Sequence, residues 1–236
     1  MPTVADADRM ASPHGMAVKF YFPDDTEADI VAASYNGFPA ANSDEFLAFI
    51  NALAASGPDA QKPTPLDKFE ADHPAAAAFM KDQNPPPLSL ATESYFGVNS
   101  FKFTNAKGDV IFGRYQIRPV AEAAYLSKED AAKAAPNYLM AEIKQRVEKA
   151  PVQFKLLVQV AEKGDAIANP SITWPDTRKS IELGTIEIAK AMDDSAIAQR
   201  ELVFLPTVMQ DGIEPADPMI DARAHTYVES FSRRSQ

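Results

Sequence analysis

The chain has 236 residues, of which 46% are hydrophobic and 24% are charged, and its formal net charge is −10. This size suffices for one large domain or two small ones, and the acidic balance argues against nucleic acid and anionic membranes as partners. The absence of cysteine excludes disulfides, thiolate catalysis and cysteine-ligated zinc or iron–sulfur sites.

Membrane-spanning and leader segments are not expected either. No run approaches 18 apolar residues, so no transmembrane helix is predicted. No basic segment followed by an apolar one opens the chain, so we expect no signal peptide in it, and the sequence does not choose between cytoplasm and periplasm. Histidine occurs only at His14, His73 and His225, which leaves little for a histidine metal site or a Ser-His-Asp hydrolase.

The N-terminal region predicts two strands. Apolar side chains alternate along residues 16–22, which indicates a strand with one buried face, and residues 29–33 predict a second, short strand. Asn36-Gly37 is typical of a turn.

A helix and a long connection should follow. Ser43 is expected to cap a helix that runs to residue 55, with Phe46 in its apolar stripe. Residues 57–93 are rich in proline and alanine and predict a connection that contains one short helix, beginning after Asp72 or His73.

The middle of the chain predicts a hairpin and then a helix. Residues 94–118 have apolar residues on both sides of an Asn-Ala-Lys-Gly turn at 105–108. Ser127 opens a helix in capping-box style that runs to about Ala150, with a break at Pro136 left open.

Two further strands are predicted. In residues 152–160 every second residue from Val152 to Val160 is apolar, and Gln153, Lys155 and Gln159 lie on the other face, so the segment should form a strand with one buried face. In residues 180–188 the alternation changes phase across Gly184, which predicts a β-bulge that helps a sheet to curl.

The C-terminal segment predicts a helix over residues 218–232, because Asp217-Pro218 is typical of an N-cap followed by the first helical position. Arg223 and Tyr227 are four residues apart and share a face of it. A guanidinium beside a phenol lowers the phenol's pKa by favouring the phenolate, which is a hard anionic ligand suited to ferric iron. His225 lies about 200° around the helix from Tyr227, so we expect it to be exposed or to act only indirectly.

Three segments together resemble the catalase family. Gly-Ile-Glu-Pro at 212–215, followed by Arg-x-x-x-Tyr, resembles the helix that carries the haem ligand in catalases. Residues 14–21 are similar to the family's Arg-Gly-Phe-Ala-x-Lys-Phe-Tyr, with His14 in place of the arginine. Residues 99–108 resemble a catalase hairpin, in which larger catalases have a histidine where Asn99 stands here. The resemblance extends over nearly the whole chain and is greatest to the short catalase-family peroxidases.

The resemblance implies a ferric, b-type haem, with tyrosine as the axial ligand of the iron. It assigns Tyr227 as that ligand, Arg223 as its partner, Phe46 to the haem edge, Arg233 or Arg234 to a haem propionate, and Asn36, or else Ser34, to the peroxide on the distal side. Asn36, Phe46 and the two arginines each also have a plainer interpretation. Asn36 can simply begin a turn, Phe46 can be a core residue, and the two arginines can complement the negative end of the helix dipole.

The implied fold is α+β, a single domain over residues 1–236 with an antiparallel catalase-like β-barrel core and flanking helices, incomplete at its N-terminal strands. The implied function is a haem-dependent peroxidase or catalase acting on hydrogen peroxide or organic hydroperoxides, with an organic electron donor and a homo-oligomer left open. The family's distal histidine lies upstream of the segment where this sequence begins, and no histidine here fits its role. Two alternatives therefore stay open: a catalytically impaired haem-binding core or fragment without activity of its own, and an enzyme that rearranges lipid hydroperoxides.

Overall fold

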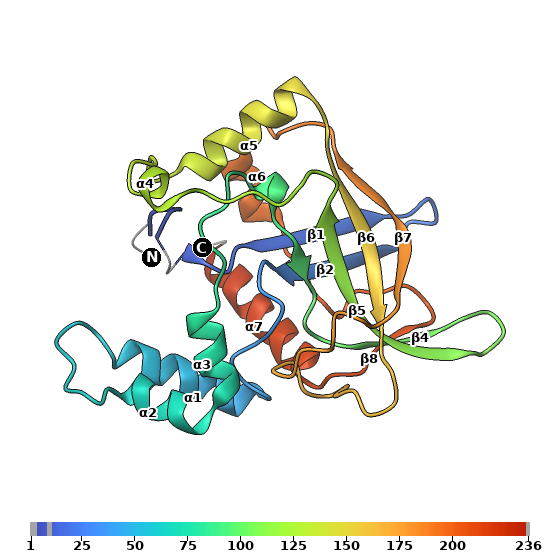
Figure 1. Ribbon diagram of the computed structural model, residues 1–236. Helices are drawn as coiled ribbons and strands as arrows, with labels where there is room; N and C mark the ends of the chain where they lie inside the picture. Colours follow the sequence, from blue (N-terminus) through green and yellow to red (C-terminus); the bar gives the residue numbers. More distant parts are fainter. Residues whose placement is uncertain (1–3, 9–10, 235–236) are drawn as a thin grey trace.

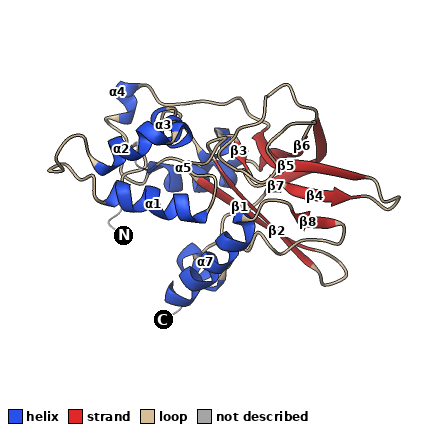
Figure 2. Ribbon diagram, turned by 90° about the horizontal axis from the view of Figure 1, so that it is seen from below, coloured by secondary structure: helices blue, strands red, loops and turns tan. Residues whose placement is uncertain are grey.

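The computed structural model describes residues 4–8 and 11–234, and its architecture is α+β. Strands gather in one part of the molecule and most helices in another (Figures 1 and 2). The strands of the described residues are β1 (Gly15–Tyr21), β2 (Glu27–Ala33), β3 (Tyr95–Phe96), β4 (Phe101–Thr104), β5 (Val110–Pro119), β6 (Val152–Val160), β7 (Ser180–Ile188) and β8 (Ile213–Pro215).

The helices form three groups around the sheet (Figure 1). They are α1 (Ser43–Ala54), α2 (Pro65–Asp72), α3 (Pro74–Lys81), α4 (Lys128–Ala131), α5 (Tyr138–Lys149), α6 (Ser195–Glu201) and α7 (Met219–Arg234), with one 3₁₀ turn at Leu90–Thr92. The first three pack together at one end of the molecule, α5 lies at the opposite end, and α7 runs beside β1 and β2. In the part of the chain that the structure describes, no helix is both long and apolar enough to cross a membrane.

All strand pairs are antiparallel, and β5 is the centre of the sheet. One edge of β5 pairs with β3 and β4, and its other edge pairs with β6, which pairs with β7. From β3 the sheet continues to β2 and β1, and from β4 it continues to β8. Among the described residues β1 therefore forms one end of the sheet and β7 another. The expected antiparallel barrel-like core is present as a curled, open half-barrel.

The core lies against the inner face of this sheet. Alternation along β6 buries Val152, Phe154, Leu156 and Val158, as predicted. Towards the end of the strand the prediction fails, because Val160 is only half-buried and Gln159 of the other face is buried. Burying a side chain of this size contributes about 1.5–3 kcal/mol. The same cluster includes residues from both covering helices, Val147 of α5 and Ile220 of α7.

The predicted bulge is confirmed. The β6–β7 register passes from Leu156 opposite Gly184 to Leu157 opposite Glu182, which leaves Leu183 as the extra residue. An extra residue bends its strand and increases the local twist, so the bulge contributes to the curl of the sheet.

Most predicted elements are found, with small corrections at their ends. The cap of α1 is Asn42 and not Ser43, because the Asn42 side chain accepts the Glu45 N–H at 3.0 Å. The break at Pro136 is confirmed, since α4 and α5 are separate helices. The helix α3 begins at Pro74, directly after His73, which was one of the two expected starting positions.

Two expectations were wrong. A second helix, α2, precedes the predicted short one, and its capping box pairs Thr64 with Asp67. The Gly-Ile-Glu-Pro segment is not only a turn: residues 213–215 form β8, which pairs with β4. The pairing partner of so short a strand depends on contacts far away in the sequence, so no local pattern indicated it.

Candidate active site

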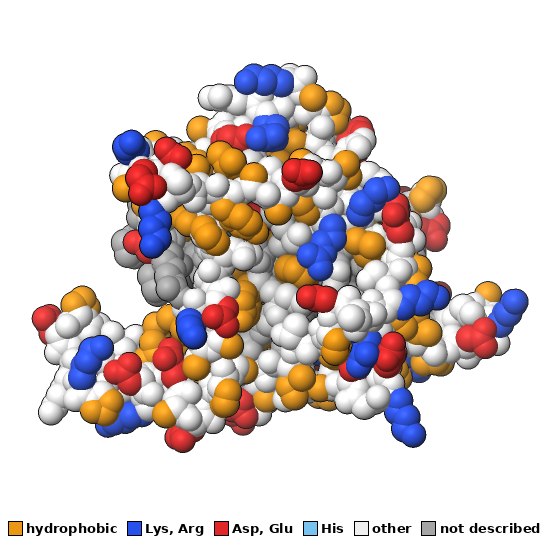
Figure 3. All heavy atoms as spheres, in the orientation of Figure 1, with side chains coloured by type: hydrophobic (Ala, Val, Ile, Leu, Met, Phe, Trp, Pro, Cys, Tyr) orange, Lys and Arg blue, Asp and Glu red, His pale blue; other side chains and the backbone are white. Residues whose placement is uncertain are grey.

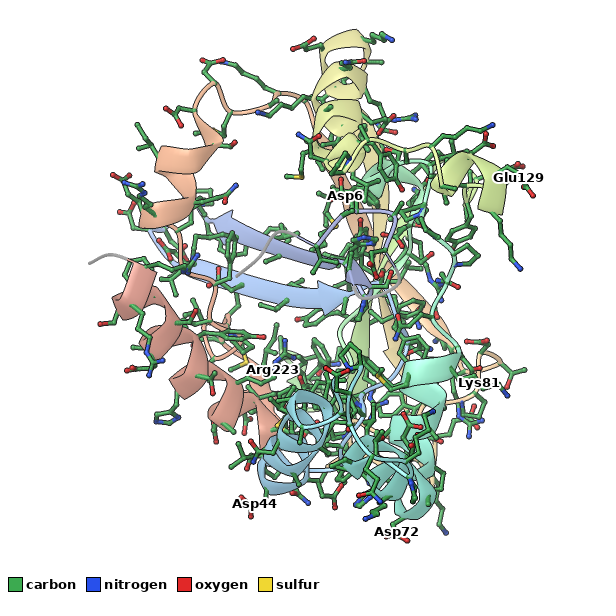
Figure 4. All side chains as sticks on the ribbon, turned by 90° about the vertical axis from the view of Figure 1, so that its left-hand side faces the viewer. Asp6, Asp44, Asp72, Lys81, Glu129 and Arg223 are labelled. Carbon is green, nitrogen blue, oxygen red and sulfur yellow. The ribbon has the colours of Figure 1, made fainter. Side chains whose placement is uncertain are left out.

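Asp217 caps α7, as the sequence predicts, and the helix begins at Met219, one residue later than expected, and ends at Arg234, two residues later. The buried Asp217 carboxylate accepts the Met219 N–H at 2.9 Å, which satisfies one free donor of the first turn. Met219, Ile220 and Ala224 are buried and dock the helix on the sheet. This docking turns the neighbouring face of α7, which carries Arg223, toward the sheet (Figure 4).

Arg223 and Tyr227 are in direct contact, as their spacing predicts. Arg223 donates two hydrogen bonds to the Tyr227 phenolic oxygen, from Nε at 3.1 Å and from Nη2 at 2.7 Å. Two donors on one oxygen fix the direction of the phenol and can balance a negative charge on it.

A buried chain of hydrogen bonds continues from this pair. Arg223 Nη1 donates to Asn99 Oδ1, and Asn99 Nδ2 donates to Asp217 Oδ2 at 2.7 Å. Asn99 and Asp217 are both buried, with exposed fractions of 3% and 1%. We call these four residues, Tyr227, Arg223, Asn99 and Asp217, the α7 network.

The charge of Asp217 is balanced from several sides. Burial raises the pKa of its carboxyl above the ordinary value of 3.8. Hydrogen bonds from Asn99 and from the Met219 N–H oppose that effect, as do the charges of Arg114 and Arg223.

Arg114 of β5 is buried behind this network, with an exposed fraction of 4%. It donates to Ser100 Oγ at 3.2 Å and to the carbonyl oxygens of Ile172, Ala166 and Asn169, at 2.8 to 3.1 Å. Burial lowers its pKa to about 10, against the opposing charges of Asp217 and Asp165, so it stays a cation at neutral pH.

A small cavity lies beside Arg223 and Asn99 of the α7 network. Its volume is only about 10 Å³, and residues of the sheet such as Ile30 and Val31 also line it. That volume is close to the minimum for one water molecule.

Asn36 and Ser34, the two candidates for the distal position, lie in the turn after β2. The Asn36 carbonyl accepts from Thr173 Oγ1 at 2.7 Å. Buried Ser34 accepts the His14 N–H at 2.9 Å. Neither of these hydrogen bonds involves Arg223 or Tyr227. The role of Asn36 or Ser34 in orienting peroxide stays a prediction.

Phe46 lies in an open groove between α1 and α3, which we call the α1–α3 groove. Its volume is about 730 Å³ and its lining is mainly apolar: Phe46, Phe49, Ile50, Leu53, Ala77, Phe79 and Met80, with Ser12, Glu70, Lys81 and Gln83 beside them. Phe46 contacts Phe38 at 4.8 Å and Phe49 at 6.3 Å between ring centroids. Figure 3 shows hydrophobic and charged side chains interspersed over the face of the molecule that includes these helices.

The two C-terminal arginines have partners near α7. Arg233 donates to Glu229 at 2.8 Å, and Arg234 donates to the Gln199 carbonyl of α6 at 3.4 Å. Both side chains are exposed. A propionate contact remains a prediction for both.

All three histidines are engaged away from Tyr227. His225 is exposed, as expected, and contacts the Asp221 carbonyl at 2.7 Å. His73 stacks on Phe69, and His14 Nδ1 lies 2.9 Å from buried Glu93. In the described part of the chain, no group of three or more histidine, aspartate or glutamate residues could hold a metal ion.

Sequence reasoning missed two features of this site. Asn99 was noted only as a replacement for histidine, although it links Asp217 to Arg223 across separations of 118 and 124 residues. Arg114 was not singled out. The available signal was an arginine in the middle of a predicted strand, since a buried charge needs a partner.

The chain is similar to proteins of one family. A sequence profile of the family described as Catalase matches residues 3–235. A catalase-related peroxidase of Synechococcus elongatus is 30% identical over 235 residues, covering 97% of this chain and 69% of the relative. A catalase-related peroxidase of Mycolicibacterium paratuberculosis is 32% identical over 225 residues, covering 94% and 71%.

Solved structures show the same fold. A fungal catalase superposes with a TM-score of 0.83 at 18% identity, and catalase A from Saccharomyces cerevisiae with a TM-score of 0.82 at 18% identity. Each covers 98% of this chain, but the chain spans only about half of their length, 49% and 51% respectively.

Proposed function

The chain belongs to the catalase family, and on this premise we propose that it is an oxidoreductase that decomposes hydrogen peroxide or organic hydroperoxides. The names of its relatives, catalase-related peroxidases, support this reaction class. We further propose that it works with ferric, b-type haem, whose iron Tyr227 would bind.

The observation that carries the proposal is the geometry of Arg223 and Tyr227. Two N–H groups of one guanidinium converge on the phenolic oxygen at 3.1 and 2.7 Å. An oxygen held in this way is pre-oriented as a ligand, and the outer-shell donor tunes the metal that it binds.

The residues present fit ferric haem chemically, since a phenolate oxygen is a ligand that proteins use for haem iron. Bound haem would supply the redox-active iron at which the peroxide O–O bond is cleaved. Tyr227 would hold the iron, and Arg223 would stabilise the negative charge on the Tyr227 oxygen. Phe46 would pack against the haem edge, and Arg233 or Arg234 would turn from its present partner to a propionate.

Asn36 or Ser34 would orient the peroxide by hydrogen bonding. The apolar α1–α3 groove supports organic hydroperoxides and an organic donor among the substrates, because apolar lining with few polar groups is typical of sites for such molecules.

The positions of the histidines favour one alternative, a catalytically impaired haem-binding core. His14, His73 and His225 all have partners away from Tyr227. Without an acid–base group near the peroxide, the rate is expected to fall by about 10²–10⁴-fold. In that case the chain would bind haem and show little activity of its own.

The test is an absorption titration of the purified chain with ferric haem, with Tyr227→Phe beside it. We expect a ferric tyrosinate-type spectrum at one haem per chain that is lost in the variant. Tyr21→Phe is the matched control, because Tyr21 is 70% exposed and should leave the spectrum unchanged. Peroxide consumption by the loaded chain then separates an active enzyme from an impaired core.

Two results would contradict the proposal. A wild-type spectrum identical to free haem would exclude a specific site. An unchanged spectrum in Tyr227→Phe would exclude Tyr227 as the ligand.

A further inference from the structure

We propose that Arg114 is a positioning residue of the α7 network. Its charge keeps the buried Asp217 ionised, and ionised Asp217 turns the oxygen of the Asn99 amide toward Arg223. The effect on a haem ligand rests on the proposed function. The effect on the Asn99 amide does not.

The contacts of Arg114 do not neutralise its charge. Its hydrogen-bond partners are a hydroxyl and three backbone carbonyls, and its guanidinium lies over the Trp174 ring at 4.3 Å. All of these partners are neutral. A buried cation is costly without a countercharge, so its balance must come from a carboxylate close by.

Asp217 is the better of the two nearby candidates. Arg114 interacts electrostatically with Asp217 and Asp165. Asp165 already has a partner, because Arg178 donates to both of its oxygens at 2.9 Å. Asp217 is more deeply buried, and the charged groups that act on it are Arg114 from β5 and Arg223 from α7.

A second connection places Arg114 beside the network. Arg114 Nε donates to Ser100 Oγ, and Ser100 is fully buried. The Ser100 carbonyl accepts the Ala216 N–H at 3.0 Å. Ser100 and Ala216 are the chain neighbours of Asn99 and Asp217, so Arg114 lies where it can act on both.

The charge state of Asp217 then acts on how the Asn99 amide points, together with Arg223, which can only donate. An ionised carboxylate only accepts hydrogen bonds. Asn99 must therefore present its NH₂ group to Asp217, which leaves its oxygen for Arg223, and these are the bonds observed.

Neutral Asp217 would permit the reverse arrangement. A protonated carboxyl can donate to the Asn99 oxygen, and the Asn99 NH₂ group would then face the Arg223 guanidinium, donor against donor. Arg223 would lose the Asn99 oxygen as an acceptor. Its guanidinium would then no longer be fixed in the position from which it donates two hydrogen bonds to Tyr227. The Asn99 amide does not ionise. Arg114 can therefore affect only how this amide is oriented.

The experiment uses the full chain and four variants. Arg114→Gln removes the charge and keeps donors, Arg114→Lys keeps the charge, and Asp217→Asn removes the carboxylate and, with its oxygen kept at the cap, places an NH₂ group, which cannot accept, against the Asn99 amide. Arg118→Met, on the same strand, is the control. The first readout is the ¹⁵N side-chain amide resonance of Asn99 without haem, assigned by its loss in Asn99→Ala.

We expect Arg114→Gln and Asp217→Asn to shift this resonance to the same new position, while Arg114→Lys and Arg118→Met leave it unchanged. The second readout is the ferric haem titration. Affinity should fall about 10–100-fold in the two shifted variants, as for loss of an outer-shell partner, and remain unchanged in the other two.

Two results would overturn the proposal. One is an unshifted resonance in Arg114→Gln when Asp217→Asn shifts it. The other is an equal shift in Arg114→Lys and Arg114→Gln, which would show that Arg114 acts only by holding its loop. If Arg114→Gln does not fold, the wild-type chain still tests the step from Asp217 to Asn99. The Asn99 amide must move together with the Asp217 carboxyl ¹³C resonance during acid titration, and independent movement refutes the proposal.

The two proposals can fail separately. If the wild-type chain binds no haem, the proposed function fails, and the amide resonance still tests Arg114. If haem binds through Tyr227 and the Asn99 resonance is unchanged in Arg114→Gln, only the positioning role of Arg114 fails.

Discussion

The α7 network and the α1–α3 groove are built on opposite principles. In the network, each buried polar group has a partner, and the adjoining cavity is about 10 Å³. The groove measures about 730 Å³, and its contacts are mainly between aromatic and aliphatic side chains. A buried polar group left unpaired costs about 1–3 kcal/mol, so the network has one favourable arrangement. Aromatic contacts contribute about 0.5–1.5 kcal/mol each and tolerate several geometries, so the groove can adapt to different molecules.

The largest effect is expected for Phe49, a buried residue that lines the α1–α3 groove. Phe49→Ala should destabilise the protein by about 3–5 kcal/mol, because Phe49 is 3% exposed and contacts Phe46, Phe69 and Phe79. Phe46→Ala should cost clearly less, since Phe46 is only half-buried. Urea denaturation of both variants measures the difference. Equal losses would mean that Phe46 is packed as tightly as Phe49.

A smaller effect should come from the turn that leads into α7. Gly212 has φ +83, and a Cβ there would lie 2.7 Å from the Thr104 carbonyl oxygen. Gly212→Ala should therefore cost at least about 1–2 kcal/mol, the penalty for a side chain in the left-handed region. Gly57→Ala is the control, because a Cβ at Gly57 meets nothing within 4 Å. Thermal unfolding of the pair tests this, and equal midpoints would show that the turn relaxes freely.

The smallest effect is the pH dependence of stability that Asp217 of the α7 network contributes. Burial raises the pKa of Asp217 above 3.8 in the folded state. The folded state then binds its proton more readily than the unfolded state, so the stability linked to Asp217 is present at acid pH and declines as pH rises through the raised pKa. Asp217→Asn removes this titration.

The free energy of unfolding of the wild type, relative to Asp217→Asn, should therefore fall between about pH 4 and neutral pH. Denaturant midpoints of both proteins over that range provide the measurement. A difference that rises with pH would reverse the sign assigned to Asp217.

Local patterns in the sequence determined many elements of this protein. Alternation along residues 152–160 identified β6, the phase change at Gly184 identified the bulge, and Asp217-Pro218 identified the start of α7. These succeeded because periodicity and capping depend on residues within one or two turns of each other. The four-residue spacing of Arg223 and Tyr227 placed them in contact for the same reason.

The tertiary structure alone decided which distant groups meet. The pairing of β8 with β4, the link from Asn99 to Asp217 and Arg223, and the position of Arg114 beside them all join segments far apart in the chain. Neither a hydrophobic period nor a short motif encodes such contacts, because they follow from how the sheet curls and where α7 docks on it. The sequence by itself therefore determined the contact between Arg223 and Tyr227 on α7, and the fold supplied the buried partners that hold these two residues in place.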